Sequence, residues 1–519
     1  MQLTSSRTPR FSRLGLAFIV TSTVTIAVML ASLIVSFAYS EQTLPGNLVQ
    51  QRAANRQHTT TTPRERAFRD VGLQMFQWPW NDIAHECRTS LGTMGIRRVL
   101  ISPPHENLNI PTWTSSYAPV SYRLDSKLGT RNELRRMVET CHAHGVDIIA
   151  DAVMNHMAPA IPPFRGIAGS TFHRYCYPGI YTSADFHHCQ LTRDGVLHTY
   201  FDRGQVQQCD ALGLPDLDTG SPHVQQVLHT YLRDLLSVGV DGFRIDAAKH
   251  ISAADIAGIL SVVPADKFVV QEVIIGLDEP IHPQEYFRNG RVFDFAFAGV
   301  AKDALHYGDL AGLFLAGAEQ GLLPPSQAVP IVTNHDFERD VNLLTYRDGW
   351  AYHFTTLLML ATQHGSPFLY SGYAFDSRDQ PAPSTPAGLV ATPRCAPNLL
   401  RPQVGQFLCV QRHAAYRTMV EWRYRAMSGT LQPRHNHTSD IPVLATARII
   451  WRQPGVVALM RNGLLFVANW SGHSVKIPLS PGQTDSTSLI SLHAGRVELD
   501  DALLTVPQGD IVVSMRTAH

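Results

Sequence analysis

The feature that most constrains this chain is the run Val-Asp-Gly-Phe-Arg-Ile-Asp-Ala-Ala-Lys-His at residues 240–250. Phe243 and Ile245 favour a buried strand. Side chains alternate along a strand, so Arg244 and Asp246 face one side while Phe243 and Ile245 face the other. Burying a charge is costly unless the charge is paired or used. This side of the strand is therefore predicted to be a functional site, with a structural Arg–Asp pair as the alternative.

Three further apolar segments also end in polar residues. They are Asp-Ile-Ile-Ala-Asp-Ala-Val-Met-Asn-His from residue 147, Phe-Val-Val-Gln-Glu-Val-Ile from residue 268 and Pro-Ile-Val-Thr-Asn-His-Asp from residue 330. In a parallel barrel, catalytic side chains gather at the carboxyl ends of the strands. One strand–helix repeat separates Asp246 from Glu272, and about two separate Glu272 from Asp336. The three carboxylates are therefore predicted to converge.

Length and composition limit the possible classes of protein. A chain of 519 residues is too long for a single core and predicts a large domain with additions. Lys+Arg and Asp+Glu both number 43, which gives no electrostatic support for a nucleic-acid partner. Among the 24 histidines, no His-x-x-x-His pair with a nearby Glu supports a zinc protease.

The first forty residues have the pattern of an export signal. Basic residues precede an apolar stretch at 14–38, and Ala38-Tyr39-Ser40 provides small residues for cleavage after Ser40. The stretch is also long enough to span a bilayer, so 1–40 is a signal peptide or an uncleaved signal anchor. Residues 41–66 are expected to be a flexible linker. Either way we expect a secreted or outward-facing protein, in contact with a membrane only if the segment is uncleaved.

Seven cysteines in an exported chain predict disulfides with one thiol left over. The sequence alone does not assign the pairs.

Four motifs resemble those of the α-amylase family of glycoside hydrolases, in particular its animal-type branch. They are Asp-Ala-Val-Met-Asn-His (151–156), Gly-Phe-Arg-Ile-Asp-Ala-Ala-Lys-His (242–250), Gln-Glu-Val-Ile (271–274) and Asn-His-Asp (334–336). The likeness extends from about residue 67 to the C-terminus. It implies the disulfides Cys87–Cys141, Cys189–Cys209 and Cys395–Cys409, and leaves Cys176 unpaired.

The predicted fold class is α/β, a (β/α)8 TIM barrel with an excursion after strand 3 and a C-terminal antiparallel β-sandwich. Barrel strands are expected near 71–77, 97–102, 147–153, 241–246, 268–272, 292–296, 330–334 and 366–370. The barrel is assigned to 67–156 and 240–440, and the segment between them, 157–239, is longer than a strand–helix connection needs and resembles domain B of the family. From 441 to 519, short alternating runs separated by turns such as Arg461-Asn462-Gly463 indicate the sandwich.

The resemblance implies that the configuration at the anomeric carbon is retained, by two carboxyl groups about 5–5.5 Å apart. By motif position Asp246 is the nucleophile and Glu272 the acid/base. Arg244 is expected to keep Asp246 ionised, and Asp336 to hold substrate hydroxyls. Mutual repulsion among the three acids favours a protonated Glu272.

Further substrate-binding residues are assigned by motif. The histidines at two motif ends are expected to bond the sugar, two aromatic residues to stack on glucose rings, and a lysine to line the leaving-group side. The residues are His156, His335, Trp113, Tyr117, Lys249 and, in the first motif, Asp151. The alternative for Trp113 is that it only packs a loop.

The resemblance also implies a calcium ion. Asn155 and Asp216 offer hard oxygen ligands suited to Ca²⁺, and the matching backbone carbonyls are those of Gln207 and His250. Such an ion would clamp 157–239 to the barrel.

The chloride site of the animal branch is not expected. Arg244 and Asn334 match two of its ligands, but the basic third ligand aligns with Trp350. Arg347 lies nearby and replaces it only if the alignment slips by one helical turn.

We therefore expect a secreted, calcium-containing, monomeric α-amylase that cuts internal α-1,4 bonds of starch, glycogen and malto-oligosaccharides. The alternatives are a transglycosylase or exo-acting enzyme of the same family, and a catalytically silent carbohydrate-binding scaffold. The intact set of Asp246, Glu272 and Asp336 argues against the silent scaffold, because clustered acids are costly to hold.

Overall fold

A computed structural model describes residues 69–339, 342–427, 447–480, 483, 487–495, 497–500 and 502–516. The predicted export segment 1–40 and the linker 41–66 lie outside the described residues. Within the described ranges, no helix combines the length and apolarity needed to cross a bilayer.

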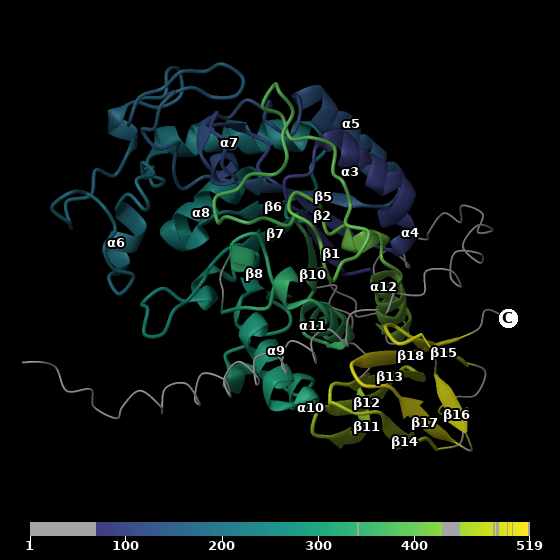
Figure 1. The fold of residues 1–519 in the computed structure, drawn as a ribbon. Coiled ribbons are helices and arrows are strands. Elements are labelled where there is room, and N and C mark those ends of the chain that lie inside the picture. Colours follow the sequence, from purple (N-terminus) through teal and green to yellow (C-terminus); the bar gives the residue numbers. More distant parts are fainter. Residues whose placement is uncertain are drawn as a thin grey trace, which may run out of the picture. The chain divides into compact units, whose positions relative to one another are not determined.

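Eight parallel strands form a nearly closed barrel, which confirms the predicted fold class (Figure 1). They are β1 Gly72–Met75, β2 Arg98–Ile101, β5 Asp147–Ala152, β6 Gly242–Ile245, β7 Phe268–Gln271, β8 Arg291–Asp294, β9 Ala328–Pro330 and β10 Phe368–Ser371. Hydrogen bonding runs in the order β10-β1-β2-β5-β6-β7-β8-β9, and each neighbouring pair is parallel. The carboxyl ends of all the strands therefore lie at one end of the barrel.

The expected alternation on β6 places Arg244 inside the barrel. In the paired register Asp151 lies beside Arg244, while Phe243 and Ile245 belong to the outer core under the helices. Below the charged residues, the barrel interior is filled by a separate apolar cluster: Leu100, Ile149, Val270, Phe293, Val329, Ile331 and Phe368. Gly242 is needed for close packing, because a Cβ there would lie 2.0 Å from the Phe268 carbonyl oxygen. The inner face thus changes from apolar to charged toward the carboxyl end.

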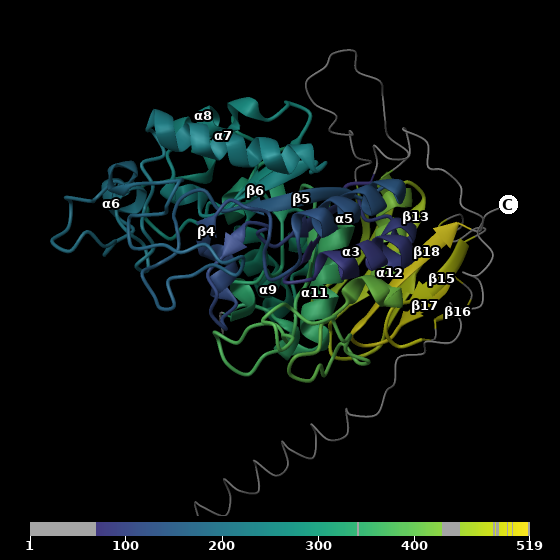
Figure 2. The same ribbon diagram turned by 90° about the horizontal axis from the view of Figure 1, so that it is seen from above.

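Helices cover the outside of the barrel, and α3 and α5 lie side by side in both views (Figures 1 and 2). They are α3 Trp80–Glu86, α4 Gly92–Met94, α5 Arg131–Ala143, α7 Pro222–Ser237, α8 Ala253–Ile259, α9 Ala296–Tyr307, α10 Leu310–Leu313, α11 Trp350–Ala361 and α12 Ala414–Met427. A capping box between Thr130 and Glu133 begins α5. Ser221 caps α7, and Pro222 occupies its first turn.

The last acid-bearing segment departs from its predicted structure. The strand predicted at 330–334 is β9, which ends at Pro330. Beyond it, the Asn334 side chain accepts hydrogen bonds from the amides of Asp336 (3.1 Å) and Phe337 (2.8 Å). This side-chain turn competes with strand pairing, so Asp336 sits on a loop.

The excursion after β5 consists mainly of turns and isolated bridges and contains α6 Arg203–Gln208 before it reaches α7. A small hairpin, β3 Glu106–Asn107 with β4 Pro119–Ser121, lies next to it through the Leu108–Gly166 bridge. The disulfides are Cys87–Cys141, Cys189–Cys209 and Cys395–Cys409, as the resemblance implied. Cys176 is free and exposed.

The C-terminal region contains two antiparallel sheets, ordered β11-β12-β13-β18-β15 and β14-β17-β16. Their strands are β11 Arg448–Gln453, β12 Val456–Arg461, β13 Leu464–Asn469, β14 Val475–Pro478, β15 Thr487–Ser491, β16 Glu498–Asp500, β17 Leu503–Val506 and β18 Asp510–Arg516. Val456 and Ala458 pack in the core shared with the smaller sheet, whereas Val457 and Leu459 join the core of the barrel. The larger sheet therefore has two buried faces.

Candidate active site

Arg244 is the centre of the charged end of the barrel. Its Nη1 donates to Asp151 Oδ1 at 2.6 Å and to Asp246 Oδ1 at 2.7 Å. Its Nη2 lies 2.8 Å from Glu272 Oε1. Only 1% of the Arg244 side chain is exposed, so these ion pairs are screened little by solvent. One guanidinium thus binds the predicted nucleophile and the predicted acid/base together.

Glu272 is held in a way that favours a protonated carboxyl group. Burial raises its pKa to about 8, against the lowering effect of Arg244, and the charges of Asp246 and Asp336 raise it further. The Ala247 amide donates to Glu272 Oε2 at 2.8 Å and fixes the side chain. At neutral pH most Glu272 side chains are therefore able to donate a proton.

Asp336 and His335 lie beside this pair. The His335 ring is stacked between Tyr117 (4.8 Å between centroids) and Phe76 (4.9 Å), and burial lowers its pKa well below the ordinary value. Gln74 Nε2 lies 3.1 Å from His335 Nδ1, which leaves Nε2 to carry the proton and face Asp336 Oδ2 at 3.3 Å. A neutral His335 thus supports a carboxylate whose side chain is 39% exposed.

Asp151, Tyr117 and His156 form the neighbouring wall. Tyr117 donates its hydroxyl to Asp151 Oδ2 at 2.8 Å, while His156 Nε2 lies 2.9 Å from the Tyr117 carbonyl oxygen. Burial raises the pKa of Asp151 to about 7, with Arg244 opposing the rise. The structure therefore brings both motif histidines and Asp151 to the same end of the barrel as the three acids.

Trp113 is more enclosed than a free stacking platform. It is 9% exposed, and its ring meets Tyr117 edge-on at 6.1 Å. Trp113 Nε1 donates to the Arg378 carbonyl oxygen at 2.9 Å. Of the two residues Tyr117 is the more accessible, and Trp113 is buried against it.

Lys249 is next to Glu272, because its backbone amide donates to the Glu272 carbonyl oxygen at 3.2 Å. Its Nζ forms an ion pair with Glu279 and lies 4.7 Å from the centre of the Tyr200 ring. Tyr200 belongs to the excursion and Glu279 to the loop after β7, so this contact joins the two segments.

The four predicted calcium ligands fall into two pairs in the structure. Asn155 Nδ2 lies 3.0 Å from Asp216 Oδ1, and His250 Nδ1 lies 2.9 Å from the carbonyl oxygen of the residue before Gln207. Burial raises the pKa of Asp216 to about 7, with His187 opposing the rise at 2.6 Å. The Asn155 side chain faces this carboxylate with its amide nitrogen, and its amide oxygen is the atom that a hard cation would take.

The predicted calcium site does not consist of carboxylates alone. Over the described ranges, no three His, Cys, Asp or Glu side chains gather as a metal cluster. A calcium ion here would depend on the Asn155 amide and on backbone carbonyls as well as on Asp216.

The residues considered for chloride point elsewhere. Trp350 Nε1 donates to the Gly509 carbonyl, and its ring stacks on His493 at 4.1 Å, against the C-terminal region. Arg347 donates to the carbonyl oxygens of Glu338 (3.3 Å) and Phe375 (2.7 Å). Neither of these side chains is directed to Arg244.

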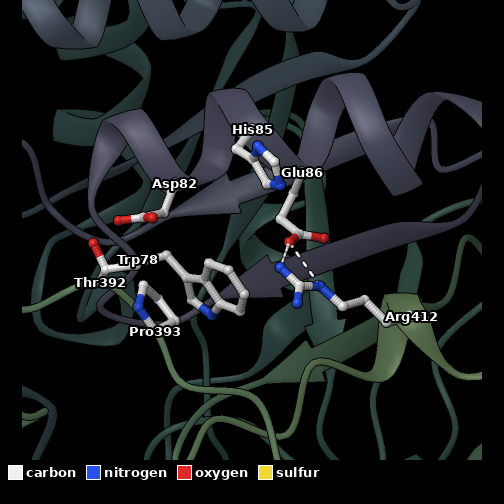
Figure 3. A pocket seen from close by; sticks show the side chains of 7 residues that line it. All are labelled: Trp78, Asp82, His85, Glu86, Thr392, Pro393 and Arg412. Carbon is white, nitrogen blue, oxygen red and sulfur yellow. Dashed lines mark hydrogen bonds and ion pairs between the residues drawn. The ribbon is translucent and has the colours of Figure 1, made fainter.

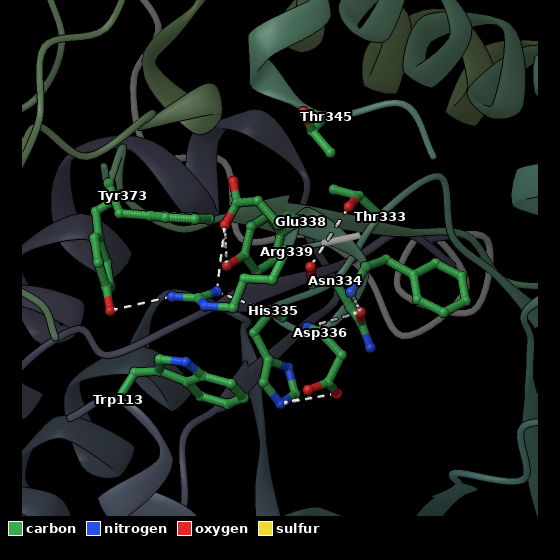
Figure 4. A network of polar contacts seen from close by, with 12 residues as sticks. Trp113, Thr333, Asn334, His335, Asp336, Glu338, Arg339, Thr345 and Tyr373 are labelled. Carbon is green, nitrogen blue, oxygen red and sulfur yellow. Dashed lines mark hydrogen bonds and ion pairs between the residues drawn. The ribbon is translucent and has the colours of Figure 1, made fainter. Parts of the chain in front are cut away.

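Several residues at the site carried no sequence signal of their own. Gln74 and His187 fall outside the four motifs, yet they fix His335 and Asp216. Glu338 and Arg339 follow the last motif directly, and they lie in a buried network around it (Figure 4). Only the proximity of Arg339 to Asp336 in the chain could have drawn attention to it.

A separate cleft, of about 290 Å³, lies between α3 and the loop after β10 (Figure 3). Its lining includes the buried Glu86, whose Oε1 accepts from Arg412 Nε at 2.9 Å and whose Oε2 accepts from Gln411 at 3.2 Å. None of the three acids lines it. The Glu86–Arg412 pair ties α3 to the end of the barrel domain.

A parallel barrel whose carboxyl end holds a buried arginine bound to Asp151, Asp246 and Glu272 is an arrangement typical of barrel hydrolases that act through paired carboxyl groups. Residues 90–259 match the model of the α-amylase catalytic domain. The chain is 36% identical over 361 residues to an α-amylase of Aeromonas hydrophila, covering 68% of this chain and 78% of that protein. The chain belongs to the α-amylase family.

Two further comparisons agree. An α-amylase of Streptomyces violaceus is 42% identical over 317 residues, which is 61% of this chain and 55% of the relative, so the chain spans about half the length of that relative. The crystal structure of α-amylase I from Eisenia fetida matches with a TM-score of 0.76 and 25% identity, over 87% of this chain and 98% of that one.

Proposed function

We propose that this protein is a retaining α-amylase that hydrolyses internal α-1,4-glucosidic bonds in starch, glycogen and malto-oligosaccharides. Asp246 acts as the nucleophile and Glu272 as the acid/base. The observation that carries the proposal is the single Arg244 guanidinium shared by both carboxyl groups, with burial raising the pKa of Glu272 to about 8. One acid is thereby kept protonated next to another that has a cation bound to it.

The chemistry follows in two steps. Glu272 gives its proton to the glycosidic oxygen while Asp246 attacks the anomeric carbon, so the C1–O bond to the leaving sugar breaks and a C1–O bond to Asp246 forms. Glu272, now ionised, then takes a proton from water, and the resulting hydroxide equivalent displaces Asp246 from C1. Two inversions give net retention.

The surrounding residues position the sugar. Asp336 accepts hydrogen bonds from ring hydroxyls at the scissile residue, and the neutral His335 and His156 add contacts beside it. Tyr117, whose ring stacks on His335, contacts the sugar with the part of its ring that remains accessible, and Lys249 lies on the leaving-group side. A related structure, an α-amylase I mutant of Eisenia fetida, was solved with maltohexaose, which supports a malto-oligosaccharide substrate.

The proposal includes a calcium ion and export. Asn155 and Asp216, with the carbonyls of Gln207 and His250, would hold the ion, which would tie the excursion to the barrel electrostatically. Three disulfides fit an oxidising compartment and support secretion.

A time course on soluble starch tests the proposal. Iodine staining should be lost early, while few reducing ends have appeared, because internal cuts shorten long chains before they release many ends. Release of small sugars with the iodine colour retained would indicate exo-action instead. A complete lack of new reducing ends would point to a transglycosylase or a silent protein.

A further inference from the structure

Arg339 is a buried cation next to the last acid, outside the roles described above. It ends the short helical turn Phe337–Arg339 (η9), and its side chain is only 2% exposed. Figure 4 shows its guanidinium above the Trp113 ring, directed toward the Tyr373 hydroxyl. Burying a guanidinium is costly, so its contacts need an explanation.

Its hydrogen bonds join segments that are distant in the sequence. Nη1 donates to the His335 carbonyl oxygen at 2.6 Å, and Nε donates to the Arg378 carbonyl oxygen at 3.0 Å. Trp113 Nε1 donates to the same Arg378 carbonyl at 2.9 Å. The loop carrying Asp336, the loop after β10 and the loop carrying Trp113 therefore meet at one guanidinium.

Aromatic rings enclose the same group. The guanidinium carbon lies 4.3 Å from the centre of the Phe375 ring, 4.5 Å from that of Trp113 and 5.6 Å from that of Phe76. Phe76 in turn stacks on His335 at 4.9 Å. Arginine suits this place because its planar fork donates in fixed directions and stacks on rings, whereas lysine does neither.

We propose that Arg339 is a positioning residue that holds Asp336, His335 and the edge of Trp113 in register with the nucleophile. This inference rests on the proposed function, and it assigns Arg339 no contact with the substrate. The guanidinium acts through the backbone of His335 and through the ring of Trp113.

Its charge also acts on Asp336. Burial raises the pKa of Asp336 to about 6; Arg244 and Arg339 oppose this rise, and Asp246 adds to it. Burial raises the pKa of the adjacent Glu338 to about 7, so in acidic solution Glu338 does not neutralise Arg339. The charged and titratable groups around Asp336 on all the packed elements are Arg244, Asp246, Glu272, His335, Arg339 and Arg378.

The chain offers a matched control in Arg347. It also donates to two backbone carbonyls, and its guanidinium carbon also lies 4.3 Å from the centre of the Phe375 ring. Its contacts are with Glu338, Phe375 and Tyr346 rather than with His335 or Trp113. Arg347 is exposed, whereas the Arg339 side chain is buried. Arg347→Met therefore removes two comparable hydrogen bonds and the contact with Phe375, but less packing, and it leaves every contact with His335 and Trp113 in place.

The experiment compares Arg339→Met, Arg339→Lys and Arg347→Met for melting temperature, kcat, KM and the pH profile on a malto-oligosaccharide. Arg339→Met should lower kcat/KM about tenfold or more, mostly through kcat, since misplacing a catalytic group by about 1 Å can cost about a hundredfold. The acidic limb of its pH profile should move to higher pH, because Asp336 then loses a nearby cation. Arg339→Lys keeps the positive charge, so it should bring the acidic limb of the pH profile back toward that of the wild type, while kcat should recover less.

Arg347→Met should keep kcat/KM within about a factor of two, whatever its melting temperature, because it leaves the placement of the catalytic groups intact. The proposal is overturned if both methionine variants lose the same activity, or if losses simply follow the melting temperature. A second measurement does not depend on turnover: the binding of maltohexaose is measured by calorimetry in variants that also carry Glu272→Gln. If the wild-type protein binds maltohexaose but does not hydrolyse it, the proposed function fails. In that case, weaker binding of maltohexaose by Arg339→Met but not by Arg347→Met would still support the positioning role.

Discussion

Glu272 receives opposing influences from its neighbours. Arg244 at 2.8 Å and the Ala247 amide at 2.8 Å favour its charged form, while burial and two other acids favour the neutral form. Burial is the larger effect, and it raises the pKa to about 8. An enzyme with such a group has its proton donor loaded through the neutral pH range.

This pKa sets the alkaline limit of activity. In the proposed mechanism the protonated form of Glu272 is the active one, so kcat/KM should fall as pH rises through about 8, by about tenfold per pH unit thereafter. The measurement is kcat/KM against pH on a malto-oligosaccharide. The control uses α-maltosyl fluoride, whose leaving group needs no proton. With this substrate, kcat/KM of the Glu272→Gln variant should not show the fall at alkaline pH. A limb that persists in Glu272→Gln would assign it to another group.

Chloride should have little effect on the rate. Arg244 is already bound to three carboxyl groups, while Trp350 and Arg347 are directed elsewhere. An anion there would have to be desolvated beside those carboxylates. Activity in chloride should match activity in acetate of equal ionic strength within about a factor of two, because both salts would then act only by screening charges. A saturable activation of several-fold by chloride would contradict this.

At this scale the sequence predicted the groups that follow strands. Arg244 and Asp246 were predicted because side chains alternate along a strand, and two charges on the same side of a buried strand are costly unless they have a function or a partner. Gln74, His187 and Arg339 were not, because their contacts join loops that only tertiary folding brings together. For Trp113 the sequence left open whether the ring stacks on sugar or packs a loop, because its burial depends on the segment near Arg378.

Among the elements, the excursion and the barrel meet at Asp216 and Asn155. The strand pattern predicted most elements within a few residues, but β9 ends at Pro330 because the Asn334 turn begins soon after it. Periodicity does not detect such side-chain turns, which is why the boundary near the last acid was wrong.

Calcium removal should loosen the junction between these elements. An ion bound only by the folded form stabilises it by about 4 kcal/mol when its concentration is about a thousand times Kd. Prolonged chelation should lower the melting temperature and activity, and added calcium should restore both. Asp216→Asn should show a smaller response than wild type. An unchanged melting temperature in excess chelator, with no metal found by elemental analysis, would rule the ion out.

For the whole molecule, helix α12 packs the barrel domain against the C-terminal sheets. Trp422 on α12 donates to the Leu465 carbonyl of β13 at 3.1 Å, and its ring lies 5.5 Å from that of Phe466. The turn between β12 and β13 has positive φ at Asn462 and Gly463, as the Asn-Gly pair predicted. Alternation predicted these strands, but not that the larger sheet would bury its second face against the barrel.

The central claim is that Asp246 becomes covalently bound to the sugar, and one measurement tests it directly. Glu272→Gln is incubated with α-maltotriosyl fluoride: fluoride leaves without a proton, so the ester forms, but the base that would hydrolyse it is missing. Peptide mass spectrometry should then find one maltotriosyl group on the peptide containing Asp246, and none when Asp246→Asn is added. No adduct, or an adduct on another acid such as Asp151 or Asp336, would contradict the account.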